Sequence, residues 1–174
     1  MPRKTLKQRQ QEAAEARGTI GQRIMARAGG GKDPNWYANE LFTELQNNRG
    51  EAGLGSLCFF QYNAKSPERY PFYDRRPLAY IIEISSTRIL GANLHYLNPG
   101  IRGEVAASLI NKKQVDFSVG YSKLIHSYIP SNMGDMYAIP VDGNEYRDVA
   151  KLVTENFVDK TGIFVGPETA WDSI

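Results

Sequence analysis

Residues 78–94 read LAYIIEISSTRILGANL. Two apolar runs, Leu78–Ile84 and Arg88–Leu94, flank the short polar turn Ser85-Ser86-Thr87, which is the pattern of an antiparallel hairpin. Just before them, the aromatic-rich run Ser56–Tyr62 predicts a third strand. Three strands this close in sequence favour an antiparallel meander. We therefore expect a small SH3-like β-barrel.

Helical patterns flank the predicted strands on both sides. Asp33-Pro34 is typical of a helix start, because aspartate caps the helix and proline fits its first turn. The spacing of Tyr37, Leu41 and Leu45 then predicts a helix to about residue 48. Other apolar spacings predict helices over 101–109, 121–128 and 145–158, and a strand over 136–141. The predicted fold class is α+β, a small antiparallel meander flanked by helices.

The charge is divided unevenly along the chain. The net charge is +2, but residues 1–32 hold eight Lys or Arg against two Glu, about +6, while residues 33–174 hold thirteen against seventeen acids, about −4. Within residues 3–28, which read as a polar helix, Ile20 and Ile24 form too narrow an apolar stripe to be held by burial. Gly29-Gly30-Gly31 follows as a hinge. We predict an extended basic N-terminal helical arm with its hinge, residues 1–32, and a single α+β domain, residues 33–174.

The arm is the predicted partner-binding region, disordered when free and ordered when bound. Positive charge on a mildly acidic body indicates a negative partner, which is either a protein surface or nucleic acid. Arg75 and Arg76, near Tyr70 and Tyr73, would also suit phosphate contact or stacking on single strands. The predicted partner-binding residues are Arg3, Lys4, Lys7, Arg9, Arg17, Arg23, Arg27, Arg75 and Arg76.

No catalytic, cofactor or metal site is expected. The glycine run before Lys32 lacks both the first glycine and the hydroxyl residue of a phosphate-binding P-loop. His95 and His126 are the two histidines, and with Cys58 they show no metal-ligand spacing. A single cysteine excludes an intrachain disulfide, and a buried, reduced thiol is expected. No apolar run approaches the ~18 residues that a membrane-spanning helix needs, so no membrane partner is expected.

Asp74 is the carboxylate in the most unusual setting. It stands in the loop Pro71–Pro77 between aromatic residues and two arginines. General acid–base catalysis needs only two carboxylates that meet in space, so the sequence leaves this alternative open. The simpler interpretation is that Asp74 and Arg76 fix the loop by hydrogen bonds while the aromatic side chains pack.

Four motifs carry a family resemblance: Phe60–Lys65 (FQYNAK), Tyr70–Asp74 (YPFYD), Arg76–Leu78 (RPL) and Leu90–Leu97 (LGANLHYL). Together they resemble a family of small virion proteins of contractile-tailed bacteriophages, over residues 56–129. Some members of that family are labelled DNA end protector and others virion structural protein.

The resemblance implies a function and a location. It implies a non-enzymatic structural or assembly protein of the tail, baseplate or neck, located in the virion and assembled in the host cytoplasm. Its arm would dock on other virion proteins or on further copies of itself in a ring. The alternative is a protein that binds DNA ends, with the basic arm on packaged DNA.

Overall fold

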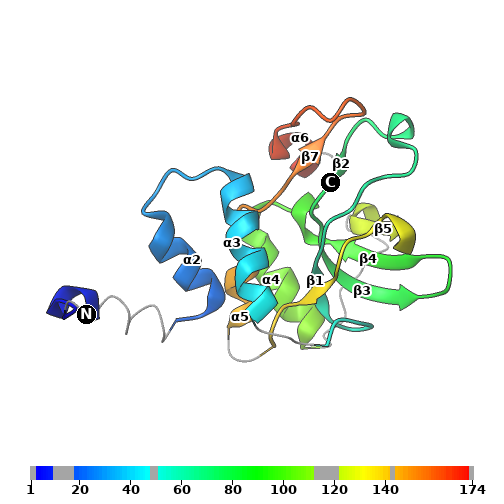
Figure 1. Cartoon of the computed structure of the whole chain (residues 1–174). Helices are drawn as coiled ribbons and strands as arrows, with labels where there is room; N and C mark the ends of the chain where they lie inside the picture. The colour runs from blue at the N-terminus through cyan, green and yellow to red at the C-terminus, as the bar shows by residue number, and fades with distance from the viewer. Residues whose placement is uncertain (1–2, 10–17, 48–50, 112–121, 142–143, 173–174) are drawn as a thin grey trace.

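The computed structural model describes residues 3–9, 18–47, 51–111, 122–141 and 144–172. Its larger sheet has five antiparallel strands in the order β5-β4-β3-β1-β6 (Figure 1). A second sheet pairs β2 with β7. The strands are β1 (Leu57–Phe59), β2 (Tyr73–Asp74), β3 (Leu78–Ile84), β4 (Ile89–Asn93), β5 (Ile125–Tyr128), β6 (Tyr137–Ala138) and β7 (Phe157–Val158). The predicted α+β class and the β3–β4 hairpin are confirmed.

The sheet is open, so the predicted SH3-like barrel is wrong. β5 and β6 are the two edge strands, and no pairing joins them in the part of the chain that the structure describes. A barrel closes only when strands of sufficient length tilt and stagger around an axis. β6 has two residues, and helices rather than further strands cover the sheet beside it.

The helices are α2 (Ile20–Ala28), α3 (Pro34–Asn47), α4 (Pro99–Ile110), α5 (Glu145–Ala150) and α6 (Pro167–Trp171), with the 3-10 turns η1 (Pro67–Arg69), η2 (Leu94–Tyr96), η3 (Ser122–Leu124) and η4 (Pro130–Asn132). Helices α2 to α5 gather on one side of the larger sheet, whereas α6 lies beside β7 (Figure 1). The predicted start of α3 is confirmed, because the Trp36 N–H donates to Asp33 Oδ1 at 2.8 Å. Within the described ranges, no helix combines the length and apolar character needed to cross a membrane.

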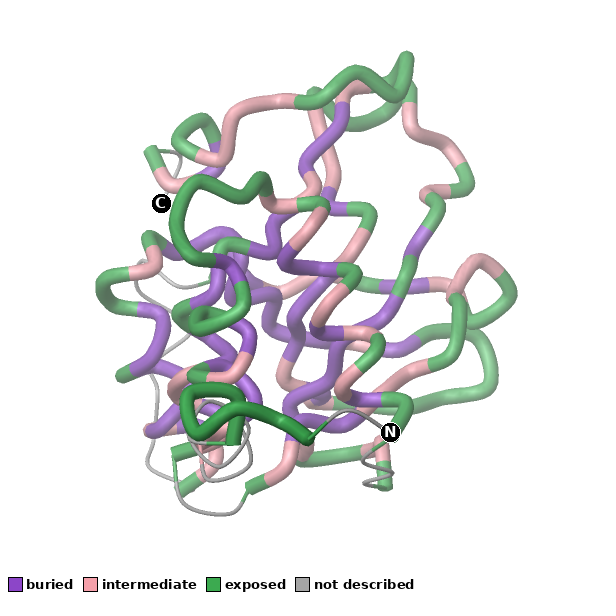
Figure 2. The backbone as a smooth tube through the Cα atoms, turned by 60° about the vertical axis from the view of Figure 1, so that its left-hand side comes forward, coloured by how far each residue is buried: buried purple, intermediate pink, exposed green. Residues whose placement is uncertain are grey.

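Both faces of the central strands are buried (Figure 2). Side chains alternate along a strand, so Leu57 and Phe59 face the helices while Cys58 packs into a second apolar cluster on the opposite face. Ile81 belongs to that second cluster and is fully buried. Its neighbour Ile82 packs only partly buried against the helix side. The double burial explains why β1 and β3 read as continuous apolar runs.

The prediction that residues 3–28 form an unpacked arm is wrong for α2. Ile20 and Ile24 are buried in the main core cluster. Thr19 and Gln22 form a capping box, and the Thr19 hydroxyl donates to Asp148 Oδ2 of α5 at 2.7 Å. A tertiary partner therefore supplies the burial that the narrow stripe could not find alone. The packed body includes α2, and the boundary predicted after residue 32 falls in the loop between α2 and α3.

The first described residues of the arm are exposed. Residues 3–9, named here the N-terminal segment, end in a helical turn at residues 6–9 that lies away from the sheet, beside α2 (Figure 1). Gly29, Gly30 and Gly31 join α2 to α3 with φ values of 60°, 102° and 77°. Other residues rarely adopt these angles, so the glycine run is needed for the shape of this loop.

Two predicted helices are also wrong. Within 121–128, the described residues form η3 and then strand β5, because Ile125–Tyr128 pairs along β4. The helix predicted over 145–158 stops at Ala150. Beyond it the chain extends, Thr154 and Glu155 bury their side chains, and Phe157 enters β7. Tertiary pairing thus overrides the apolar spacing in both places.

Candidate functional site

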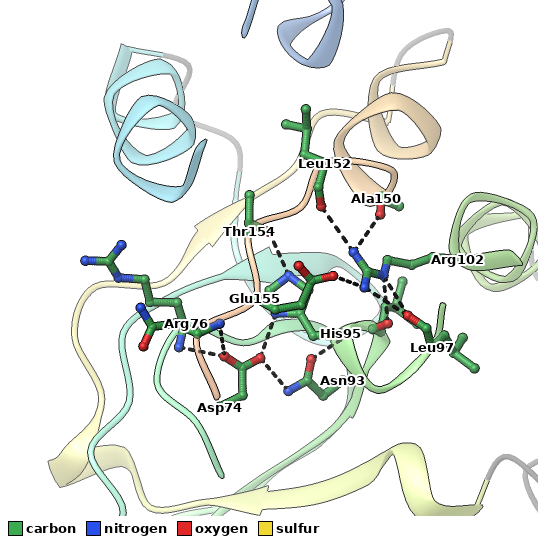
Figure 3. Close-up of polar contacts among 12 residues, drawn as sticks. Asp74, Arg76, Asn93, His95, Leu97, Arg102, Ala150, Leu152, Thr154 and Glu155 are labelled. Carbon is green, nitrogen blue, oxygen red and sulfur yellow. Dashed lines mark hydrogen bonds and ion pairs between the residues drawn. The ribbon is translucent and has the colours of Figure 1, made fainter. Parts of the chain in front are cut away.

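Asp74 lies at the centre of a buried polar network that we name the Asp74 network: Asp74, Asn93, His95 and Thr154 (Figure 3). Asp74 comes from β2, Asn93 ends β4, and His95 follows in η2. Asp74 Oδ2 lies 2.6 Å from His95 Nδ1 and accepts from Asn93 Nδ2 at 3.0 Å. On the far side of the imidazole, His95 Nε2 lies 2.7 Å from the Thr154 hydroxyl. Three distant stretches of chain therefore meet at one histidine.

The second oxygen of Asp74 holds the backbone of its own loop. Oδ1 accepts from the Arg76 N–H at 3.0 Å and from the Asn156 N–H at 3.3 Å. Burial alone would raise the pKa of Asp74, but the adjacent His95 imidazole, the Asn93 side chain and the Arg76 N–H hold it below its usual value. Asp74 is thus a carboxylate, and His95 Nδ1 is the donor between them. The predicted role of Asp74 in fixing the loop is confirmed, although it is the Arg76 backbone and not its side chain that binds.

The order carboxylate, imidazole, hydroxyl is the order of a catalytic triad. Its geometry alone would allow Thr154 to pass its proton to His95. However, His95 and Thr154 have no exposed surface and Asp74 has 3%. A nucleophile must reach its substrate, and this hydroxyl faces only protein in the described conformation. The arrangement can hold β2, η2 and the segment before β7 together, which is a structural role.

A second buried polar cluster lies beside the first (Figure 3). Arg102 of α4 is fully buried and pairs with Glu155, which is also fully buried. Its guanidinium also donates to the carbonyl oxygens of Leu94, Leu97, Ala150 and Leu152, at 2.9 to 3.3 Å. Burial lowers the pKa of Arg102, and the Glu155 carboxylate opposes this shift. One side chain therefore ties α4 to η2 and to the connection that follows α5.

The structure separates the predicted basic residues into three groups. Arg3, Lys4, Lys7 and Arg9 lie in the N-terminal segment with exposed side chains. Arg17 lies outside the described residues. Arg23 and Arg27 pack along α2 and pair with acids of α3. Arg23 Nη2 lies 3.0 Å from Glu44 Oε2, and Arg27 Nη1 lies 2.9 Å from Glu44 Oε1. The charges of α2 are thus balanced within the chain.

Arg75 and Arg76 form the third group, which lies near β2, away from the N-terminal segment (Figure 1). They line a polar cavity of about 260 Å³ together with four amide side chains, those of Asn35, Gln61, Asn63 and Asn156. Arg76 Nη1 donates to Asn35 Oδ1 at 2.7 Å. Burial and then the charge of Arg75 lower the pKa of Arg76. Among the ion pairs of the described residues, none includes Arg75 or Arg76.

The sequence did not predict either buried polar cluster. His95 is separated from Asp74 by 21 residues and from Thr154 by 59, and Arg102 from Glu155 by 53. The one available indication was that Asp74, Asn93 and His95 all belong to the family-like motifs. Across the described ranges, no three His, Cys, Asp or Glu side chains are placed to hold a metal ion.

No family model, no curated protein and no solved structure matches this chain.

Proposed function

We propose that this chain is a non-enzymatic assembly protein of a tailed-phage virion that docks on neighbouring virion proteins through its N-terminal segment. One observation carries the proposal: the basic residues are sorted by environment. Arg23 and Arg27 are paired on α2, whereas the N-terminal segment carries four exposed basic side chains in seven residues. Exposed positive charge that is gathered in one short segment can attract an acidic partner.

The Asp74 network supports a structural role for the family-like motifs. Asp74, Asn93 and His95 would be expected at the surface if the motifs supplied chemistry. Instead they are buried and direct their hydrogen bonds to one another and to backbone groups. A shared motif of this kind is explained by the need to hold a rigid body. The phage setting, the tail, baseplate or neck location and assembly in the host cytoplasm rest on the sequence resemblance alone.

The test replaces Arg3, Lys4, Lys7 and Arg9 by glutamine in a phage genome that carries this gene. The matched control replaces four exposed basic residues of the body, Arg69, Arg88, Lys151 and Lys160, in the same way. We expect purified particles to lack the first variant and to retain the control. Both purified proteins should melt at the wild-type temperature, because the N-terminal segment lies outside the core. Particles that incorporate both variants equally would contradict the proposal.

A specific observation favours the second candidate, a protein that binds DNA ends. Arg75 and Arg76 stand side by side in a polar cavity with no carboxylate paired to them in the described chain. A phosphate would relieve their mutual repulsion. In this case the purified protein should bind duplex ends, with log affinity falling against log salt by about 0.9 per phosphate contacted. Deleting residues 2–9 should then weaken DNA binding, and Arg75→Gln should weaken it further.

A further inference from the structure

An aromatic cavity of about 450 Å³ lies between β5 and the loop that leads to β2. It is separate from the polar cavity of Arg75 and Arg76. Its walls carry six aromatic rings besides a histidine: Tyr62, Tyr70, Phe72, Tyr73, Tyr96 and Tyr128. The volume lies in the range of pockets that hold small organic ligands, which are mostly apolar with a few placed polar groups.

Two buried polar atoms at this cavity have no hydrogen-bond partner within the described residues: His126 Nε2 and the Tyr128 hydroxyl oxygen. Both residues line the cavity. They are two positions apart on β5, so their side chains share one face of the strand. Tyr128 is 3% exposed. Buried polar groups are nearly always paired, so these two atoms indicate that something occupies the space beside them.

The two atoms present opposite hydrogen-bonding roles. Burial lowers the pKa of His126, so its ring is neutral near pH 7, and the Lys123 backbone engages the ring. Nδ1 donates to that backbone carbonyl, which leaves Nε2 as an acceptor. Burial and the nearby Asp74 charge raise the pKa of Tyr128 well above its usual value, against a smaller opposing effect of the Asn93 side chain, so its hydroxyl keeps its proton and can donate. The Asp74 carboxylate is not available to accept a hydrogen bond from a ligand, because four donors already bind its oxygens.

We propose that the aromatic cavity binds a tyrosine side chain presented by an extended segment of a partner protein. The ring would pack among the aromatic walls, where His126 stacks on Tyr96 with ring centroids 4.4 Å apart. The incoming phenol has a hydroxyl that donates to His126 Nε2 and accepts from Tyr128. It therefore satisfies both unpartnered atoms without bringing charge into the site.

Two observations favour a polypeptide over a nucleotide. Lys123 is the sole cationic side chain in the described lining, whereas a nucleotide brings a phosphate that needs several. The second observation is the position of β5, which is an edge strand of the larger sheet. An extended segment can add to such an edge by backbone hydrogen bonds while one of its side chains enters the neighbouring pocket.

This inference rests on the proposed docking function for the identity of the partner, but its test uses the purified full-length chain alone. The probe is N-acetyl-L-tyrosinamide, titrated into the ¹⁵N-labelled protein and followed by NMR. N-acetyl-L-phenylalaninamide, which lacks only the hydroxyl, is the matched ligand, and thymidine 5′-monophosphate represents a nucleotide. We expect shifts that map to β5 and the β2 loop. The phenylalanine analogue should bind at least fivefold more weakly, as the loss of a net hydrogen bond implies.

Tyr128→Phe removes the unpartnered hydroxyl, and His126→Phe removes both ring nitrogens; each keeps an aromatic ring. Tyr128→Phe should leave the melting temperature unchanged, whereas His126→Phe should lower it slightly, because the ring also loses its contact with the Lys123 backbone. Each change should weaken binding of the tyrosine probe about fivefold. Tyr80→Phe, a matched change on β3 outside the cavity lining, should alter neither quantity.

Equal binding of the two amino-acid probes, or unchanged probe binding in both cavity variants, would overturn the inference. Preferential binding of the nucleotide at these residues would overturn the polypeptide assignment. The particle experiment reports on the N-terminal segment alone. If the cavity binds no probe but the particle experiment still shows docking, only this inference fails. If both experiments are negative, the proposed docking function fails as well.

Discussion

Replacing Arg102 by methionine tests whether the buried Arg102–Glu155 pair holds the fold together. Methionine keeps most of the length of the side chain but donates no hydrogen bond. The Glu155 carboxylate, fully buried, loses its cation, and breaking such a pair costs about 3–5 kcal/mol. The carbonyls of Leu97 and Ala150 also lose the Arg102 donors, which adds about 1 kcal/mol each.

The sum is roughly 5–7 kcal/mol, against a typical domain stability of about 5–15 kcal/mol. Arg102→Met should therefore unfold at much lower urea or be unfolded without it. The assay is urea denaturation followed by the fluorescence of the two tryptophans and by circular dichroism. Guanidinium loss should also expose the segment after α5 to protease.

A second substitution separates the charge from the packing. Adding Glu155→Leu to Arg102→Met removes the unpaired carboxylate, so the double variant should be more stable than Arg102→Met alone by about 2–4 kcal/mol. Glu155→Leu alone, which leaves the arginine uncompensated, is the matched single variant. A loss below 1 kcal/mol for Arg102→Met would refute the reasoning. So would a double variant no more stable than Arg102→Met, because the pair would then be carrying no charge-specific energy.

Three further predictions concern other parts of the fold. Gly21→Ala would stabilise an unpacked helix by up to about 1 kcal/mol, but here the added Cβ would lie 2.7 Å from the Asp148 carbonyl carbon. We therefore expect the free energy of unfolding to fall by about 1–3 kcal/mol and trypsin to cleave faster within α2. An increase in stability would contradict the packing of this helix. Asp74→Asn should destabilise the protein by about 3 kcal/mol at neutral pH. Because the pKa of Asp74 is lower in the folded than in the unfolded protein, the stability difference between variant and wild type is present above about pH 4 and shrinks as the pH falls through the folded pKa. Unfolding curves from pH 7 to pH 2 can follow it. A difference that grows in acid would be inconsistent with a paired carboxylate. Burial raises the pKa of the Cys58 thiol, so a thiol reagent at pH 8 should label it only after urea unfolding, and rapid labelling of the native protein would show that β1 opens.

The sequence predicted the elements whose information is local. Asp33 caps α3 through a contact three residues away, and the β3–β4 hairpin follows from two apolar runs around a polar turn. The end of α5 depends on distant residues instead. Thr154 and Glu155 leave the helical path because His95 and Arg102 bind them, and no spacing within 145–158 records this.

For the candidate site too, the sequence predicted the local contacts but not the distant ones. Asp74 was identified as a loop-fixing carboxylate from its neighbours alone. Its histidine partner was not, because the contact depends on how β2 and η2 are brought together. Ile20 and Ile24 were read as too narrow a stripe for the same reason. Their cover comes from α5 and α3 together, and helix stability in proteins depends chiefly on such packing.

The packing of α2 on α5 also has a consequence for synthesis of the chain. The Ile20 N–H binds Glu145, which is made 125 residues later, and Thr19 binds Asp148, made 129 residues later. Ile20 and Ile24 therefore leave the ribosome long before the surface that covers them exists. Contacts of such sequence separation form slowly, and uncovered apolar surface attracts other chains. A product truncated before α5 would keep the sequence of α2 and its capping residues but would lack the α5 surface on which this helix packs.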